Sequence, residues 1–443
     1  MVVLIKILQV VLALSLLILI HEFGHFIFAR LFKIRVDKFY LFFDPWFSLF
    51  KYKPKNSDTE YGIGWLPLGG YCKISGMVDE SMDTKALKQE PQPWEFRSKP
   101  AWQRFFVMVA GVLFNVILAI VLYGLILFTW GEEYIRTEDV PYGIQCNDLA
   151  REVGFSNGDM ILAFDDRSVT EDPLHTLQAD LVRSRPQVIT VLRGADTVRF
   201  RFDEKFIPQL LNTPNLFSAR IPFEVASIPD TSLNAASGLE AGDRLLAVNG
   251  TPTFAVQDVQ EQLKACASQT VLLQVMRQEK TLEIPVSVTA DGLIQVYLVN
   301  DLTRYVPVTQ KQYSFFAAFP AGVKKAYATA ANYVKELGLI FSPKTEAYKS
   351  VGSFIAIGSI FPDTWNWETF WNITAWLSIM LAVLNILPIP ALDGGHMVLV
   401  LFEMITGRKP SDKFLEVTQL IGMVLLIGLM VLAFGNDILR LFR

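Results

Sequence analysis

Residues 21–25 read His-Glu-Phe-Gly-His and lie at the end of a long apolar run. Histidines four positions apart share one face of a helix, so His21 and His25 can bind one metal ion together. Glu22 stands where zinc hydrolases place the carboxylate that takes a proton from a metal-bound water. Residues 7–20 contain only two polar side chains. This stretch therefore predicts a zinc hydrolase site carried by a membrane-spanning helix.

The composition predicts a membrane protein with a sizeable water-soluble part. The chain has 443 residues, of which 51% are hydrophobic and 19% are charged, and its mean hydropathy is +0.33. The net charge of −4 gives no basic field of the kind that binds nucleic acid, so we expect no nucleic-acid partner. No small-residue cleavage site follows the first apolar run, which favours a retained span over a signal peptide.

Four segments are apolar and long enough to cross a lipid bilayer, namely residues 2–28, 105–130, 373–387 and 418–434. Lysine and arginine residues gather in the loop after the first segment and in the loop between the third and the fourth. By the positive-inside rule these two loops face the cytoplasm. The region between the second and third segments is then expected outside.

The outside region contains an internal repeat. Residues 154–164 (GFSNGDMILAF) align without gaps with residues 238–248 (GLEAGDRLLAV), 84 residues later. The repeated pattern resembles the PDZ domain, and β-rich stretches follow both copies. We therefore expect two PDZ-like α/β modules in tandem, at residues 131–222 and 223–305.

Two features of the outside region stay open at this point. Residues 323–340 could form an amphipathic helix that lies at the membrane face or against a span, or equally a solvated linker helix. Cys146 and Cys266 could pair in an oxidising compartment, although nothing else nearby looks dependent on a disulfide.

A catalytic zinc site needs a third protein ligand, and Asp393 is the best candidate. It belongs to residues 385–395, which read NILPIPALDGG. A carboxylate at the end of an apolar span is costly unless it binds something, and the two prolines before it interrupt the helix. His396 is a weaker alternative, and His175 lies within the first repeat module.

The two metal motifs together make the resemblance specific. HEFGH in the first span with the NILPIPALDGG stretch near the third resembles the site-2 protease family of intramembrane zinc metalloproteases, over nearly the whole chain. The PDZ-like pair between spans two and three resembles the bacterial RseP type. The resemblance implies that His21, His25 and Asp393 bind Zn²⁺, that Glu22 is the general base and that Asn385 holds substrate near the scissile bond.

The resemblance also implies further substrate contacts. Residues 111–115 (GVLFN) in the second span resemble a family element in which Asn115 faces the active site. Residues 62–73, within a loop at about 60–75, resemble the family's membrane-dipping β-like loop, in which an exposed strand edge could pair with an unwound substrate. The candidate substrate-binding residues of this loop are Gly62, Gly64, Gly69 and Gly70.

The predicted fold is an α-helical polytopic membrane protein with four transmembrane helices, the membrane-dipping β-like loop and two inserted PDZ-like α/β modules. The predicted divisions are 1–130 for the first membrane part, the two modules, 306–370 for an amphipathic or interfacial segment, and 371–443 for the second membrane part.

The predicted function is zinc endopeptidase activity of the inner membrane, in regulated intramembrane proteolysis and the stress response. Its expected substrates are single-span membrane proteins and remnant signal peptides that enter from the lipid bilayer. The resemblance implies that a protein substrate is first trimmed on the outside and that an anti-sigma factor is one such substrate. The PDZ pair would lie in the periplasm as a substrate filter, with the active site near the cytoplasmic side. A membrane adaptor with a vestigial metal site and a transporter with a broken helix are the alternatives.

Overall fold

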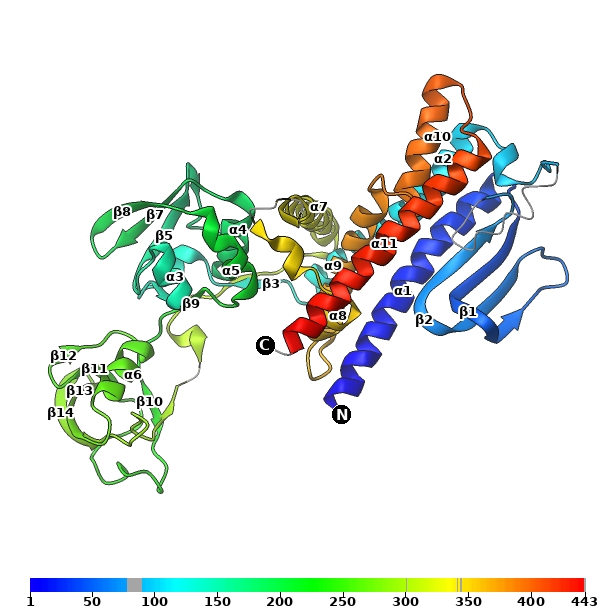
Figure 1. Cartoon of the computed structure of the whole chain (residues 1–443). Helices are drawn as coiled ribbons and strands as arrows, with labels where there is room; N and C mark the ends of the chain where they lie inside the picture. The colour runs from blue at the N-terminus through cyan, green and yellow to red at the C-terminus, as the bar shows by residue number, and fades with distance from the viewer. Residues whose placement is uncertain (78–89, 300, 341, 343–344, 442–443) are drawn as a thin grey trace. The chain divides into compact units, whose positions relative to one another are not determined.

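The computed structural model describes residues 1–77, 90–299, 301–340, 342 and 345–441, and it divides into two compact units (Figure 1). A helical unit contains residues 1–131, 312–342 and 347–443. A β-rich unit is built from residues 132–311.

Four long apolar helices of the helical unit confirm the four predicted spans. Each has the length and composition needed to cross a membrane. They are α1 (Val2–Leu31), α2 (Ala101–Thr129), α9 (Trp367–Ile386) and α11 (Asp412–Leu441). Their exposed surfaces are rich in Leu, Ile, Val and Phe, as expected of surfaces that face lipid.

Three further helices complete the helical unit: α7 (Phe315–Ile340), α8 (Phe354–Ile360) and α10 (Asp393–Thr406). The α7 helix packs along α2, where Gly322 lies against Gly124. A Cβ on Gly322 would be 2.7 Å from the backbone nitrogen of Gly124, so this close approach requires glycine.

Strands β1 (Val36–Tyr52) and β2 (Glu60–Ile74) form an antiparallel sheet beside α1. Tyr40 of β1 pairs with Gly62 on one side and with Tyr71 on the other. Because both partners belong to β2, the chain of β2 must bend around β1. Residues 70–74 of β2 pair with β1, and Gly70 in this stretch lies against Ile18 of α1. The predicted β-like loop at residues 62–73 lies within β2.

The two PDZ-like modules of the β-rich unit share one topology. Each has a four-stranded antiparallel sheet, in the order β6-β5-β7-β8 or β12-β11-β13-β14, with one helix between its second and third strands in sequence. The first module contains β4 (Ile144–Cys146), α3 (Asp148–Val153), β5 (Met160–Phe164), β6 (Arg167–Ser168), α4 (Leu177–Ser184), β7 (Val188–Arg193), β8 (Asp196–Arg201), α5 (Ile207–Asn212) and β9 (Phe217–Ala219).

The second module contains β10 (Val225–Ser227), β11 (Arg244–Val248), β12 (Thr251–Pro252), α6 (Val256–Ala265), β13 (Thr270–Arg277), β14 (Lys280–Ser287) and β15 (Tyr297–Leu298). At the two ends of the β-rich unit, β3 (Glu132–Tyr134) pairs with β16 (Thr309–Lys311), so the start of the predicted first module is bonded to a strand that follows the second module. Short 3-10 turns are η2 (Phe96–Ser98), η3 (Thr137–Asp139), η4 (Leu174–Thr176), η5 (Glu204–Phe206), η6 (Leu302–Arg304) and η8 (Ala347–Ser350).

In each module the aspartate of the repeated Gly-Asp motif joins the turn before a strand to the end of another strand, and we call this arrangement a clasp. Asp159 and Asp243 are fully buried, and each accepts a hydrogen bond from the backbone N–H three residues earlier. Each also forms a two-pronged ion pair with an arginine at the end of a strand: Arg193 at 2.8 Å and Arg277 at 2.7 Å. The two arginines are again 84 residues apart, so the repeat extends beyond the quoted stretch.

Cys146 and Cys266 are free thiols rather than a disulfide pair. Burial raises the pKa of the Cys146 thiol to about 12, with a further contribution from the Asp159 carboxylate. Because the thiolate is the reactive form, Cys146 is inert near neutral pH.

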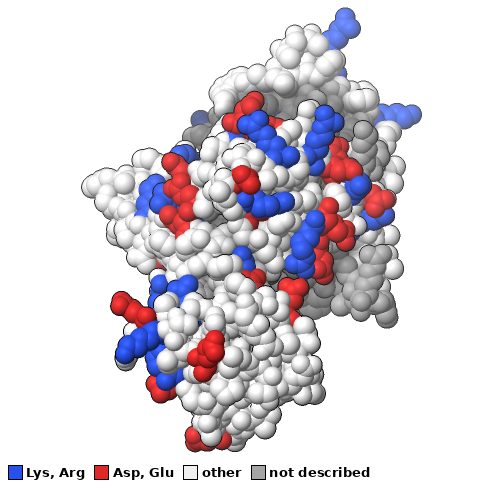
Figure 2. Space-filling view, turned by 90° about the vertical axis from the view of Figure 1, so that its left-hand side faces the viewer, with Lys and Arg blue, Asp and Glu red and all other residues white. Residues whose placement is uncertain are grey.

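Charges of both signs are interspersed on the face of the molecule shown in Figure 2. Many charged side chains of the described residues form ion pairs, for example Arg136 with Asp139. This mixture agrees with the small net charge and gives that face no single-sign field.

Candidate metal centre

The two histidines of the motif lie where α1 and α2 come unusually close. A Cβ on Gly24 would be 2.5 Å from the backbone oxygen of Ala110, so α1 can approach α2 only with glycine there. A Cβ on Gly111 would be 2.4 Å from Nε2 of His25 and 2.7 Å from Cε1 of His21. Gly111 therefore leaves the space that the two imidazoles occupy.

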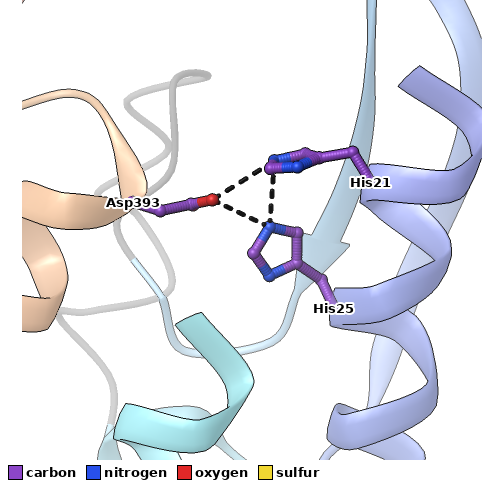
Figure 3. A group of neighbouring side chains, drawn as sticks. All are labelled: His21, His25 and Asp393. Carbon is purple, nitrogen blue, oxygen red and sulfur yellow. Dashed lines mark hydrogen bonds and ion pairs between the residues drawn. The ribbon is translucent and has the colours of Figure 1, made fainter. Parts of the chain in front are cut away.

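Asp393 is delivered by a tightly folded connection between α9 and α10. Ala391 has a left-handed backbone with φ of 75°, which is strained for a residue with a Cβ. Cβ atoms on Gly394 and Gly395 would lie 2.1 and 2.6 Å from backbone oxygens of this connection. The two prolines cannot continue a helix, so Asp393 becomes the first residue of α10 and points toward α1 (Figure 3).

The three predicted ligands converge on one point. Nε2 of His21 and Nε2 of His25 are 3.3 Å apart, and Oδ2 of Asp393 lies 3.2 Å from the first and 3.3 Å from the second (Figure 3). Ligands of a tetrahedral zinc ion, about 2.0–2.1 Å from the metal, are separated by roughly 3.3–3.4 Å. The triangle therefore has the size that a zinc ion requires.

The donor atoms also fit a metal chemically. Oδ2 of Asp393 is buried and has no hydrogen-bond partner among the described residues. Such a carboxylate oxygen is costly unless a cation binds it. Two neutral imidazoles with one carboxylate leave a single negative charge beside a divalent cation, and only three protein ligands leave the fourth position open.

Hydrogen bonds behind the imidazoles set their orientation. Nδ1 of His25 lies 2.8 Å from the carbonyl oxygen of Val107, which can only accept. His25 therefore carries its proton on Nδ1 and leaves the Nε2 lone pair for a metal.

His21 is held in a comparable way by Asn115. The amide nitrogen of Asn115 lies 3.1 Å from Nδ1 of His21, while the amide oxygen, Oδ1, has no hydrogen-bond partner among the described residues. Turning the amide by half a turn brings Oδ1 to a protonated Nδ1 and satisfies both groups. His21 then also presents Nε2 as a lone pair.

Glu22 lies next to the three ligands and is half-buried. Its carboxylate accepts a hydrogen bond from the backbone of Cys72 in β2. Strand β2 is thus hydrogen-bonded to the candidate base on α1.

The other candidate substrate-binding residues have different surroundings. Asn385 lies near the metal ligands, with Nδ2 3.4 Å from Nε2 of His21. Gly62 and Gly69 lie against the rings of Tyr40 and Phe43, where any Cβ would be 2.3–2.4 Å from ring atoms. Gly64 contacts the backbone of β1 and Gly70 contacts Ile18 of α1, so all four glycines have a packing reason for lacking a side chain.

Some contributors to the site carry no sequence signal. The Val107 carbonyl and the Cys72 backbone are groups that every residue has. Gly422 of α11 lies against Pro390, where a Cβ would be 1.9 Å from the proline carbonyl oxygen. One glycine in a long apolar helix gives no hint of such a contact. His396 is outside the group of three ligands.

Comparisons with known proteins agree with this geometry. A Xylella fastidiosa protein whose name describes a zinc metalloprotease is 30% identical over 448 residues, which cover 96% of each chain. Escherichia coli regulator of sigma-E protease RseP is 28% identical over 451 residues, covering 97% of this chain and 98% of its own. Protease RseP of Yersinia pestis is 28% identical over 458 residues, with the same coverage. Peptidase family M50 matches residues 9–429, and the chain therefore belongs to this family, the site-2 protease family of zinc metalloproteases.

Proposed function

We propose that this zinc metalloprotease hydrolyses peptide bonds within the transmembrane segments of single-span membrane proteins, such as a pre-trimmed anti-sigma factor, and within remnant signal peptides. The observation that carries this proposal is the triangle of His21, His25 and Asp393, which lies between membrane-spanning helices beside a β-strand. Membership of a protease family favours this function over the adaptor and the transporter.

Each of the three metal ligands is held in place by a different part of the protein. His21 and His25 are fixed by Asn115 and Val107, and Asp393 is fixed by the folded connection before α10. A zinc ion held by them supplies Lewis-acid polarisation of a carbonyl and a water of lowered pKa. Glu22 accepts the proton of the attacking water and delivers it to the leaving amine.

Substrate presentation is assigned to β2 and Asn385. A peptide bond in a helix is shielded by its own hydrogen bonds and must be extended before hydrolysis. The 70–74 arm of β2 pairs with β1 and lies beside α1, where the Cys72 backbone is bonded to Glu22, so we place the unwound substrate segment alongside this arm as an added strand. The Asn385 amide, close to the metal ligands, then holds the substrate backbone.

The membrane orientation follows from the basic residues near the span ends. Arg30 and Lys33 end the first span, and Arg408 and Lys409 lie between the last two. We place these ends in the cytoplasm of an inner-membrane protein, so that His21 and His25, near the same end of α1, lie toward the cytoplasmic side. The PDZ-like pair is then periplasmic and acts as a filter that rejects substrates with a bulky outer domain.

The direct test uses full-length protein in detergent with a tagged single-span substrate, in a trimmed form and in a form that keeps its outer domain. Cleavage of the trimmed form, located within the span by mass spectrometry, is expected. Cleavage outside the span would contradict the intramembrane reaction, and equal cleavage of both forms would contradict the filter.

A further inference from the structure

A basic cavity of about 470 Å³ lies where α1 ends and is separate from the metal centre. Its lining includes three basic side chains, one acidic side chain and one indole. Its lining residues are Arg30, Lys33, Ile34, Arg35, Asp58 and Trp94.

The cations of the cavity exceed its anions. Arg35 pairs with Asp37 at 2.8 Å, so its charge is already compensated. Arg30 and Lys33 are exposed and have no ion-pair partner among the described residues. Asp58 is the single acidic residue of the lining. The cavity therefore keeps uncompensated positive charge.

Lys33 occupies a backbone position that normally belongs to glycine. The N–H of Ile34 bonds to the carbonyl of Ala29 at 2.8 Å and the N–H of Lys33 bonds to that of Arg30 at 3.1 Å. This pair of hydrogen bonds is the Schellman ending of a helix, whose left-handed residue is usually glycine. Lys33 adopts that conformation with φ of 56°. The chain thus accepts strain while keeping a cation on the cavity.

Two tryptophans near the cavity indicate that it lies at the level of lipid headgroups. The indole of Trp102, at the start of α2, contacts Phe32 just after α1 ends, and the carbonyl of Trp94 accepts a hydrogen bond from Arg35. Trp94 and Trp102 are 45% and 48% exposed. Half-exposed tryptophans beside two span ends mark the interface between hydrocarbon and water.

We propose that this cavity binds the phosphate of an anionic phospholipid, with Arg30 and Lys33 as its charged donors. A guanidinium presents paired N–H groups to phosphate oxygens, and an ammonium adds three donors on a flexible stem. Trp94 forms the interfacial wall beside the headgroup, and the acyl chains extend along the apolar surface of α1. The site would tie the end of the helix that carries His21 and His25 to the membrane surface.

Native mass spectrometry of the delipidated full-length protein tests the proposal. The protein is titrated with phosphatidylglycerol and, separately, with phosphatidylcholine of the same acyl chains. The first phosphatidylglycerol is expected to bind about fivefold more tightly than phosphatidylcholine, because Arg30 and Lys33 against Asp58 leave one net positive charge to act on the anionic headgroup. The Arg30→Gln/Lys33→Gln variant is expected to lose this preference.

The matched control is Lys51→Gln/Lys53→Gln, which removes the same charge from exposed positions of the helical unit outside the cavity. It should keep the preference to within about twofold. Equal binding of both lipids by the wild type, or an equal loss in both double variants, would show that these cations act only as a diffuse orientation signal and would overturn the proposal. Displacement of the lipid by inorganic phosphate alone would overturn the lipid assignment in favour of a soluble phosphate.

Lys33→Gly separates lipid binding from folding. Glycine relieves the left-handed strain at this position, so the thermal stability in detergent should be equal or higher. Phosphatidylglycerol affinity should still fall. A Lys33→Gly protein that is stable and binds phosphatidylglycerol as the wild type does would contradict the role of Lys33.

Discussion

The side-chain amide of Asn115 on α2 lies 3.1 Å from Nδ1 of His21 on α1, and Asn115 has no exposed surface. A buried amide in this place can fix the tautomer and the ring orientation of a metal ligand. We therefore assign Asn115 to positioning His21, where the resemblance alone implied a contact with substrate.

Asn115→Leu should lower zinc affinity about ten- to a hundredfold, because the leucine fills the volume but offers no acceptor to Nδ1. Asn115→Asp, which keeps an acceptor, should retain most of the affinity. Zinc retained against a graded chelator series measures both variants. If Asn115→Leu retains zinc as the wild type does, Asn115 does not position His21 for metal binding.

Gly111→Ala should prevent zinc binding in a folded protein. The added methyl would lie 2.4 Å from Nε2 of His25, so the imidazoles must leave the positions that the metal needs. Gly124→Ala on the same helix is the control, because the nearest atom to its methyl would be in the ring of Phe319, at 3.1 Å. Zinc content after purification distinguishes them, and normal zinc in Gly111→Ala would refute the described packing.

Gly422→Ala should weaken zinc retention from a distance. Its methyl would lie 1.9 Å from the Pro390 carbonyl oxygen, three residues before Asp393, so the connection that delivers the carboxylate must shift. An affinity loss of about tenfold or more is expected from displacing one ligand in this way. Gly428→Ala, on an exposed part of the same helix with nothing within 4 Å, should behave as the wild type. Equal retention by the two variants would contradict the role of this contact.

Asp159→Asn and Asp243→Asn should each destabilise their own module by roughly 3 kcal/mol, because each leaves an arginine and a backbone N–H with a poorer partner. Hydrogen exchange of the full-length protein resolves the modules separately. Faster exchange is expected only in the module that carries the substitution. Zinc retention should stay unchanged, and exchange that rises in both modules alike would show that the clasps are not local.

The parts of the structure that the sequence predicted are those governed by local rules. Apolar length gives the spans, and the repeated Gly-Asp pattern gives two copies of one topology, because positive-φ glycines and a buried carboxylate leave few alternatives there. The ligand set could be proposed because His21 and His25 are one turn apart and Asp393 is a carboxylate in an apolar context.

The remaining parts depend on contacts between distant segments. Nothing in the string of residues reveals that the Val107 carbonyl accepts a hydrogen bond from Nδ1 of His25 or that Gly422 lies on Pro390. The glycines of β2 are predicted substrate contacts, and only the fold shows that aromatic rings of β1 occupy the space beside two of them. Such packing exists only after the chain has folded, so it has no local pattern.

Zinc content measured together with substrate cleavage, for wild type and for Glu22→Gln, separates metal binding from proton transfer at the site. We expect one zinc per chain in both proteins, because Glu22 is not a ligand, and this zinc content is the reference for the cleavage assay. A proton acceptor at position 22 has a further consequence. Cleavage should fall about 10²- to 10⁴-fold in the variant, because the proton acceptor is gone. Undiminished cleavage by Glu22→Gln would contradict its role as base, and a wild type that cleaves without zinc would contradict the metal centre itself.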